Sequence, residues 1–394
     1  MKILHVSSFW DPYLLGGAEV YAANLAAEQR LAGHDVGVIT HGIPGEMVVE
    51  AVPTGPIHRD LEQQQARWRR AIFRLEDIYN PLAAARITKA IRRFGADVVH
   101  SHGVQGLGTV SLTAGASLAP HVHQLHDHWL LCRRTTMTLP NGELCQDMSC
   151  RVIAAIRAQI VKRHPPELLL AYSQVSARAH ETLSWTAGRF RQLPQTIGVE
   201  YEGVRSRPFD PSKPLTFGYL GQLVPHKGID TLLRAFEGLG GGHRLLIAGE
   251  GALAPMVEAA ATGNVTYLGR VDGEAKERFF ADVDCMVLPS RCPDVAPLVV
   301  LESRARGVPV IGARIGGIPT LLGDRCAPLL FEPGSADELR ASVERFIAEP
   351  SRFVPSPDEP PVRIGRTWAD HASDVVEFYQ EAIELRRQRI AGSG

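Results

Sequence analysis

The sequence predicts an α/β protein built from two doubly wound domains. Short β-branched runs alternate with amphipathic helical stretches along the chain, which is the pattern of parallel sheets. The alternation is interrupted once, by a run rich in Arg, Pro, Ser and Asp at Glu202–Lys213, and then begins again. The length of 394 residues fits two or three domains of about 150 residues each.

The first series of elements fills the N-terminal half. We expect strands at Lys2–Ser7, Asp35–Thr40, Asp97–His100, His121–Leu125 and Leu168–Tyr172. Helical periodicity occupies Ala18–Ala32, Glu62–Phe73, Ala83–Phe94 and Val152–Arg163.

The second series follows the interruption. Its expected strands are Thr216–Leu220, Arg244–Ala248, Val265–Tyr267, Cys285–Leu288, Val308–Ile311 and Pro328–Leu330. Its expected helices are Gly228–Glu237, Pro255–Thr262, Gly273–Ala281, Leu298–Arg306, Ile318–Leu322 and Ser335–Ile347. A Pro-rich run then precedes a terminal helix at Thr367–Arg387.

These elements define three segments. Residues 1–202 form an N-terminal domain, residues 203–366 form a second domain, and residues 367–394 form a helix that we expect to cross back to the first domain. Open sheets bind ligands outside the carboxyl ends of their strands, so a cleft between the two domains is the expected site.

The composition is that of a soluble globular protein. Hydrophobic residues make up 45% and charged residues 22% of the chain, and the net charge of −1 gives no overall attraction to nucleic acid. The first residues have only a short apolar run before Asp11-Pro12 and read as a strand rather than a signal peptide. Six cysteines in a chain of this length do not indicate a disulfide scaffold, so we expect a cytoplasmic protein.

The segment from Pro293 to Pro319 is the most informative stretch. Asp294 and Glu302 lie eight positions apart around the apolar start of a helix, and a β-branched strand and a Gly-Gly turn follow. Acids beside free backbone amides at a helix N-terminus can hold a ligand rich in hydroxyls and phosphate oxygens. The structural alternative is a buried helix face with Glu302 on its rim.

Two glycine-containing loops follow predicted strands. Gly16 and Gly17 precede a helix after the first strand, where the backbone can approach an anion or simply form a turn. Lys227 and Gly228 precede the first helix of the second domain, a geometry that suits a diphosphate, although a lone Lys there is usually a solvated helix end.

A histidine-rich run, His121 to Trp129, covers the fourth predicted strand and the turn that follows it. His126 is either a hydrogen-bonded structural residue or part of a site, and Asp127 is its neighbour. The nearby cysteines Cys132, Cys145 and Cys150 could suggest zinc. Their spacing lacks a Cys-x-x-Cys or His-x-x-x-His arrangement, so we expect loop packing and no metal site.

Two further patterns remain open as alternatives. The loop Gly249–Ala254 fits Gly-x-Gly-x-x-Ala and, with Asp272, resembles a weak NAD fingerprint, which gives an NAD-dependent dehydrogenase as one hypothesis. The stretch Arg67–Arg74 is basic with interleaved aromatics, as in helices that contact membranes or nucleic acid. Flanking acids, Asp77 among them, favour an ordinary solvated helix face instead.

Together these motifs resemble the retaining GT-B glycosyltransferases, a glycosyltransferase family 4-like group that includes sucrose and glycogen synthases. The resemblance extends from Met1 to about Leu330 and is strongest in the second domain. It implies two Rossmann-like domains that face each other across a cleft. It also implies transfer of a hexose-type sugar, with retained configuration, from a nucleoside diphosphate sugar to an acceptor hydroxyl.

The resemblance assigns roles to individual residues. His126, Asp294 and Lys227 are the implied catalytic residues, with His126 positioning the sugar. The implied donor-binding residues are Gly16, Gly17, Gln222, Lys227, Gly249, Arg270, Asp294, Pro297, Leu298, Val299 and Glu302. Glu19 and Asp127 are the implied acceptor-binding residues.

The resemblance also implies partners. A UDP- or GDP-sugar is the expected donor, with no cofactor and no metal, and the acceptor is a glycan, a lipid-linked glycan or a small molecule. A weak peripheral contact with the inner membrane face stays open. The sequence departs from the family's pattern at three positions: Gln222 stands where Arg is usual, and Asp294 and Thr320 stand where Glu is usual. These departures motivate an alternative in which the protein binds sugar nucleotides with little turnover.

Overall fold

The computed structural model describes residues 1–394 except 12–15, 43–44, 53–66, 199–208, 356–365 and 393–394. The chain divides into two compact units. Unit 1 contains residues 1–135, 146–194 and 368–394, and unit 2 contains residues 136–145 and 195–367. The predicted domain boundary at residues 202 and 203, and the start of the predicted helix Glu62–Phe73, lie outside the described residues.

Unit 1 is built on a parallel sheet of seven strands in the order β3-β2-β1-β4-β5-β6-β7. The strands are β1 (Lys2–Val6), β2 (Asp35–His41), β3 (Val48–Val52), β4 (Val98–Ser101), β5 (His121–Leu125), β6 (Leu168–Ala171) and β7 (Phe190–Gln192).

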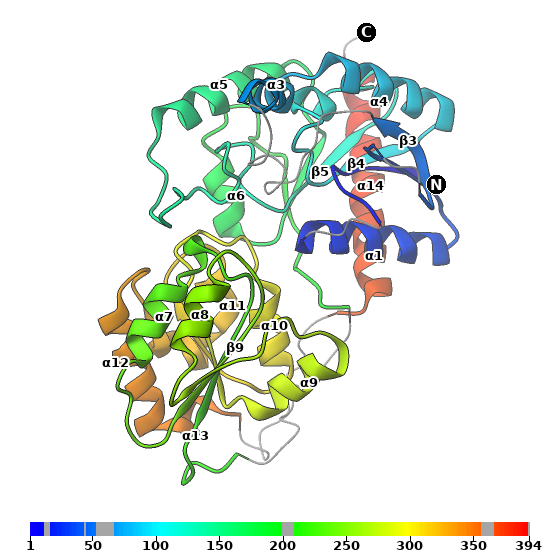
Figure 1. Ribbon diagram of the computed structural model, residues 1–394. Helices are drawn as coiled ribbons and strands as arrows, with labels where there is room; N and C mark the ends of the chain where they lie inside the picture. Colours follow the sequence, from blue (N-terminus) through cyan, green and yellow to red (C-terminus); the bar gives the residue numbers. More distant parts are fainter. Residues whose placement is uncertain (12–15, 43–44, 53–66, 199–208, 356–365, 393–394) are drawn as a thin grey trace. The chain divides into compact units, whose positions relative to one another are not determined.

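Helices cover both faces of this sheet (Figure 1). They are α1 (Gly17–Leu31), α3 (Arg67–Ile78), α4 (Pro81–Phe94), α5 (Met148–Lys162), α6 (Gln174–His180) and α14 (Trp368–Ala391), with a short 3₁₀ helix η1 (Thr109–Leu112). The terminal helix α14 packs against α1, β4 and β5 within unit 1. The apolar core beneath α4 includes Leu4 and Val6, whereas His5 points to the face covered by α1 and α14.

Unit 2 has a parallel sheet of six strands in the order β10-β9-β8-β11-β12-β13. The strands are β8 (Thr216–Leu220), β9 (Arg244–Ala248), β10 (Val265–Tyr267), β11 (Cys285–Leu288), β12 (Val310–Ala313) and β13 (Leu330–Phe331). The other elements are η2 (Pro225–Lys227), α7 (Ile229–Phe236), α8 (Ala254–Ala260), α9 (Gly273–Asp282), α10 (Leu298–Ala305), α11 (Ile318–Leu322), η3 (Asp324–Leu329), α12 (Ala336–Ala348) and α13 (Pro350–Phe353).

The two doubly wound parallel sheets confirm the predicted fold class. Differences from the expected elements have local causes. The strand expected at Val308–Ile311 begins at Val310 because Pro309 has no N–H to donate to the ladder. Helix α5 begins at Met148 rather than Val152, since the Asp147 carboxylate accepts a hydrogen bond from Ser149 N and caps the helix there.

Each sheet reverses its winding direction once, and this position matters for binding. Strand order changes direction between the adjacent strands β1 and β4 in unit 1, and between β8 and β11 in unit 2. The loops that leave the carboxyl ends of such neighbouring strands run in opposite directions and leave a crevice where ligands bind. Gly16, Gly17 and Glu19 follow β1, Lys227 follows β8 and Asp294 follows β11, whereas His126 and Asp127 follow the next strand, β5.

Candidate active site

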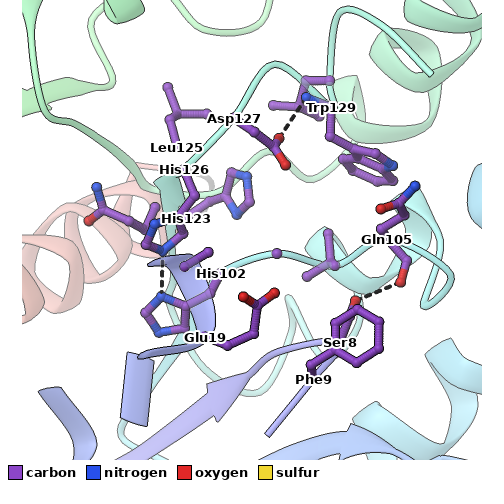
Figure 2. A pocket seen from close by; sticks show the side chains of 15 residues that line it. Ser8, Phe9, Glu19, His102, Gln105, His123, Leu125, His126, Asp127 and Trp129 are labelled. Atoms are coloured by element: carbon purple, nitrogen blue, oxygen red, sulfur yellow. Dashed lines mark hydrogen bonds between the residues drawn. The ribbon is translucent and has the colours of Figure 1, made fainter. Parts of the chain in front are cut away.

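Unit 1 contains a pocket at the carboxyl ends of β1, β4 and β5 (Figure 2). Loops after these strands and the first turn of α1 supply its walls. The lining residues are Ser8, Phe9, Ala18, Glu19, His102, Gly103, Val104, Gln105, His123, Gln124, Leu125, His126, Asp127, Trp129 and Leu130. The pocket therefore contains three of the predicted residues, Glu19, His126 and Asp127.

His126 is held on both ring nitrogens. Its Nε2 lies 3.1 Å from Nδ1 of His102, and its Nδ1 lies 2.9 Å from the hydroxyl of Tyr172. The Tyr21 ring packs edge-on against the imidazole. Burial lowers the pKa of His126 to about 3, so the ring is neutral at physiological pH.

Two carboxylates share this pocket. Glu19 lies in the first turn of α1, and burial raises the pKa of its carboxyl, with a smaller contribution from the negative charge of Asp127. Asp127 Oδ1 accepts a hydrogen bond of 2.7 Å from the backbone N–H of Trp129, which fixes the turn after β5. The pocket thus combines carboxylate acceptors with a neutral imidazole.

A buried ion pair supports the pocket wall. Arg157 on α5 donates to Asp77 on α3 at 2.6 Å, and its guanidinium stacks on the Trp129 ring at 4.1 Å. Asp77 also accepts hydrogen bonds from the Trp129 indole at 3.0 Å and from Gly106 N at 2.8 Å. The expectation that Asp77 lies on a solvated helix face is wrong, because tertiary contacts bury it.

In unit 2, a cation and a carboxylate meet in the loops that follow the neighbouring strands β8 and β11. Lys227 Nζ lies 2.6 Å from Asp294 Oδ1, and the Ser290 hydroxyl donates to Asp294 Oδ2 at 2.8 Å. Burial acts to raise the Asp294 pKa, but Lys227 and these hydrogen bonds outweigh it and lower the pKa. Burial likewise acts to lower the Lys227 pKa, and Asp294 reverses the shift, so both groups stay charged.

The second predicted acid is paired with a different lysine. Glu302 Oε1 on α10 lies 2.6 Å from Nζ of Lys276 on α9. Leu301 and Ala305 of the same helix are buried, so α10 does have the buried apolar face that the sequence offered as a purely structural explanation. Glu302 lies at the rim of this face. Pro297, Leu298 and Val299, whose amides were expected at phosphate, form the start of α10.

The Gly-Gly turn after β12 packs directly on the Asp294 segment. Gly317 N donates to Asp294 O at 2.7 Å, and a Cβ on Gly317 would lie only 2.2 Å from Val295 O. Gly316 has φ of +57°, and a Cβ there would lie 2.4 Å from Asp294 O. The turn requires glycine because any side chain would displace the backbone that carries Asp294.

The remaining predicted donor residues have different surroundings. Gln222 is exposed, and its backbone oxygen accepts a hydrogen bond from the Tyr219 hydroxyl. Arg270 is exposed and lies 3.6 Å from Asp272. Gly249 and Gly251 pack on the backbone of residues 221–223, where a Cβ on Gly249 would lie 1.8 Å from Gly221 O. This packing explains both glycines without a dinucleotide.

Position 222 holds Gln where the family pattern has Arg, so a second cation near the diphosphate would have to come from another residue. Two arginines of unit 2, Arg291 and Arg314, each pair with a different carboxylate. Arg291 lies 2.6 Å from Asp230 and 2.7 Å from the Thr231 hydroxyl. Arg314 lies 3.2 Å from Glu332. Lys227 is therefore the cation that the structure places beside Asp294.

Several site residues had no sequence signal of their own. Ser290, Cys292 and Lys276 contact the predicted acids, and His102 and Tyr172 contact His126. For all but Lys276, which lies within α9, a position just after a strand was a usable indication, but which strands are neighbours is a tertiary property. The two buried thiols Cys132 and Cys150 lie 3.4 Å apart between their sulfur atoms.

Comparisons with known proteins identify the family. A model described as "Glycosyl transferases group 1" matches residues 214–349, and one described as "Glycosyltransferase Family 4" matches residues 15–163. With the two doubly wound sheets, these matches show that the chain belongs to the GT-B, family 4-like glycosyltransferases.

Individual relatives agree with this assignment. An uncharacterized glycosyltransferase of Methanocaldococcus jannaschii is 24% identical, over 98% of this chain and 99% of its own. Sucrose-phosphate synthase from Thermosynechococcus elongatus has the same fold, with a TM-score of 0.66, 18% identity and coverage of 100% and 98%. HepE from Anabaena, solved in complex with UDP, gives a TM-score of 0.64, 18% identity and coverage of 100% and 99%.

None of the helices in the described residues combines the length and apolar character needed to span a bilayer.

Proposed function

We propose that this glycosyltransferase is a retaining enzyme that moves a hexose-type sugar from a UDP- or GDP-sugar to an acceptor hydroxyl. The observation that carries the proposal is the Lys227–Asp294 pair, which lies at 2.6 Å in the loops that follow β8 and β11. HepE, whose structure has the same fold, was solved with UDP and with UDP-glucose, which supports a nucleoside diphosphate donor.

The donor would use the residues of unit 2. The Lys227 ammonium binds the diphosphate, and the backbone N–H groups of Leu298 and Val299, which follow Pro297, add partial positive charge at the start of α10. Glu302 accepts hydrogen bonds from the ribose hydroxyls, and Asp294 accepts from the sugar. Because Lys227 is already paired with Asp294, donor binding shares this ammonium between the carboxylate and the phosphates.

Catalysis would depend on positioning and on stabilisation of the departing diphosphate, without a bridging metal ion. Burial lowers the pKa of His126 to about 3, so the neutral imidazole would meet the sugar. Both ring nitrogens are already engaged, so His126 would orient the sugar by exchanging its hydrogen bond to Tyr172 for one to a sugar hydroxyl. The polar lining of the unit 1 pocket, with Glu19 and Asp127, fits a hydroxyl-rich acceptor such as a glycan, a lipid-linked glycan or a small polyol.

We further propose a cytoplasmic location with a peripheral membrane contact. Six cysteines in 394 residues do not make a disulfide scaffold, which suits the cytoplasm. Ile72, Leu75 and Tyr79 are exposed on and just after α3, which supports a peripheral membrane contact. Leu75→Glu would then reduce co-sedimentation with anionic vesicles, whereas Leu31→Glu, at a leucine on α1 that is even more exposed, would not.

A thermal-shift screen of UDP-, GDP-, ADP- and dTDP-sugars tests donor binding, since a ligand that binds only the native state raises the melting temperature. We expect stabilisation by at least one nucleotide sugar in the presence of EDTA, and none by NAD. Stabilisation by NAD alone would favour the dehydrogenase alternative and contradict the proposal.

A turnover assay with the donor identified in this way tests the reaction. The anomeric configuration of the product, read by NMR coupling constants, should match that of the donor. Inversion would refute the retaining mechanism. Donor binding with no transfer across a broad acceptor panel would instead support the sugar-nucleotide-binding alternative that Gln222 motivates.

A further inference from the structure

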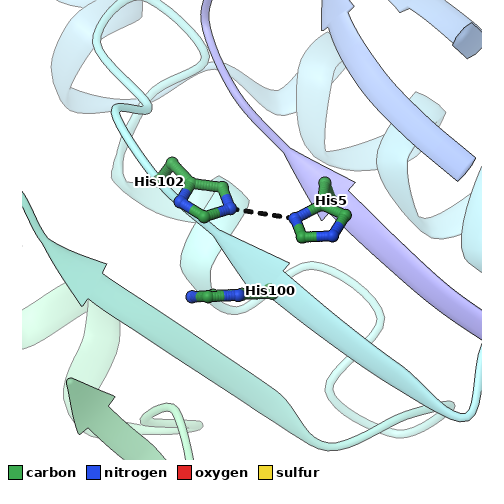
Figure 3. Close-up of side chains that lie close together, drawn as sticks. All are labelled: His5, His100 and His102. Atoms are coloured by element: carbon green, nitrogen blue, oxygen red, sulfur yellow. Dashed lines mark hydrogen bonds between the residues drawn. The ribbon is translucent and has the colours of Figure 1, made fainter. Parts of the chain in front are cut away.

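Three histidines meet on one face of the unit 1 sheet (Figure 3), and one of them, His102, also lines the pocket. His5 on β1 and His100 on β4 are direct partners in the parallel ladder, so their side chains share a face. His102 follows His100 by two positions and points to the same side. One donor nitrogen from each ring lies within 4.8 Å of the others, and all three side chains are buried.

We propose that His5, His100 and His102 form a binding site for a divalent transition metal of the zinc type. Burial lowers the pKa of His5 to about 4, and it lowers the pKa values of His100 and His102 well below the usual value. The rings are therefore neutral, which is the form that binds metal ions. An all-imidazole donor set suits Zn²⁺, Co²⁺, Ni²⁺ or Cu²⁺ and disfavours Mg²⁺ and Ca²⁺, which prefer oxygen ligands.

Each ring is anchored on the nitrogen that would face away from the metal. Gln29 Oε1 lies 2.8 Å from His5 Nε2, the Tyr379 hydroxyl lies 2.7 Å from His100 Nδ1, and His126 Nε2 lies 3.1 Å from His102 Nδ1. Hydrogen bonds of this kind orient metal-binding imidazoles and fix their tautomers. They leave His5 Nδ1, His102 Nε2 and His100 Nε2 as the coordinating atoms.

The state of these three nitrogens supports the proposal. His5 Nδ1 and His102 Nε2 lie 2.9 Å apart and share one proton. His100 Nε2 is buried and has no hydrogen-bond partner among the described residues. Ligands of a tetrahedral zinc ion lie about 3.3 Å apart, so no separation in the cluster has to shorten by more than ~1.5 Å. A metal ion would satisfy His100 Nε2, which otherwise carries the cost of an unpaired buried polar atom.

The site connects directly to the pocket through His102 and His126. Without metal, Gln29 Oε1 can only accept, so His5 carries its proton on Nε2 and its Nδ1 accepts from His102 Nε2. His102 Nδ1 then accepts from His126 Nε2, and His126 Nδ1 accepts from the Tyr172 hydroxyl. Metal on His102 Nε2 moves that proton to His102 Nδ1, which then donates to His126 Nε2. The His126 proton moves to Nδ1, where it donates to the Tyr172 oxygen.

Metal binding therefore reverses the tautomer of the pocket histidine while every imidazole keeps one proton. The reversal changes the hydrogen-bonding character of His126 without changing its charge. Metal occupancy would in this way regulate the pocket. This regulatory role rests on the proposed function, whereas metal binding itself does not.

Metal binding is tested on the full chain carrying Cys132→Ser, so that the nearby thiols do not contribute. After dialysis against a chelator, Co²⁺ titration should give visible d–d absorption at about one equivalent, which Zn²⁺ abolishes by competition. His100→Gln should weaken binding at least ~100-fold. His121→Gln, which changes a buried histidine on β5 bonded to Ser101, should leave it unchanged.

The outcomes are decisive in each direction. Folded protein that shows no cobalt band, or equal binding in His100→Gln and His121→Gln, would overturn the proposal. Should His100→Gln fail to fold by circular dichroism, Gln29→Leu replaces it, with an expected 10- to 100-fold loss of affinity typical of outer hydrogen-bond partners. Nitrogen-15 NMR of His126 tests the coupling: Zn²⁺ should move the protonated nitrogen from Nε2 to Nδ1, and an unchanged tautomer would refute it.

Discussion

Lys227 is a single residue whose environment decides the chemistry of unit 2. Its ammonium and the Asp294 carboxylate are both largely shielded from solvent, with 23% and 18% of each side chain exposed. Each keeps the other charged, and removal of one partner leaves an uncompensated charge, which costs more than the pair contributes. The pair is therefore a shielded pair of mutually dependent charges rather than an exposed surface salt bridge, and in the proposed function its ammonium would meet the diphosphate.

Lys227→Met should weaken nucleotide-sugar binding at least ~10-fold, because it removes the cation that faces the diphosphate. Isothermal titration calorimetry measures the change. Lys213→Met is the matched control, since Lys213 is an exposed lysine paired with Asp210 at 3.2 Å. An equal loss of affinity in both variants, or none in Lys227→Met, would remove Lys227 from the donor site.

Gly317 shows how one missing side chain sets the geometry of a loop. Gly317→Ala should displace the Asp294 segment, because its Cβ would lie 2.2 Å from Val295 O, and should cost about 1–3 kcal/mol of stability. Donor affinity should fall with it. Gly240→Ala, where a Cβ meets nothing within 4 Å, should change stability by less than about 0.5 kcal/mol. Urea unfolding and calorimetry compare the two, and identical behaviour would contradict the close-approach argument.

At the scale of elements, helices α3 and α5 are tied together by the buried Asp77–Arg157 pair. Arg157→Met should destabilise the protein by about 3–5 kcal/mol, since it leaves Asp77 charged and buried. The double variant Arg157→Met with Asp77→Leu should recover part of the loss, because it removes both charges. Chemical denaturation measures both effects, and a double variant no more stable than Arg157→Met would show that the charge left on Asp77 is not the cause.

Sequence periodicity predicted most elements because each strand is a short apolar run and each helix has one apolar face. It did not predict β3 or β7, which lie at or near the sheet edges and have mixed exposure. Asp77 was misjudged because its burial depends on Arg157, which lies 80 positions further along the chain. The motifs singled out Asp294 and Lys227, which contact each other, and His126, which lines the unit 1 pocket, but the contacts of His126 with His102 and Tyr172 depend on strand order.

At the scale of the molecule, the two units differ in their content of buried neutral histidine. Burial lowers the pKa to about 4 or about 3 for five histidines of unit 1, namely His5, His41, His121, His126 and His180. Unfolded histidine has a pKa near 6.5, so the unfolded state binds more protons between these values. The stability from these groups is complete above about pH 6.5 and is lost as the pH falls toward 4.

Unit 1 should therefore unfold in mild acid before unit 2. Each of the five histidines contributes of the order of 2 kcal/mol across this window, and Glu19 and Asp77, whose pKa values are raised, offset only part of it. Urea unfolding at pH 7, 5.5 and 4.5 with a chelator present, followed by pulsed hydrogen exchange and mass spectrometry, assigns the loss to each unit. His180→Leu should reduce the pH dependence, because it removes one site of proton uptake. Equal acid sensitivity of the two units, or an unchanged pH dependence in His180→Leu, would show that the buried histidines do not control acid stability.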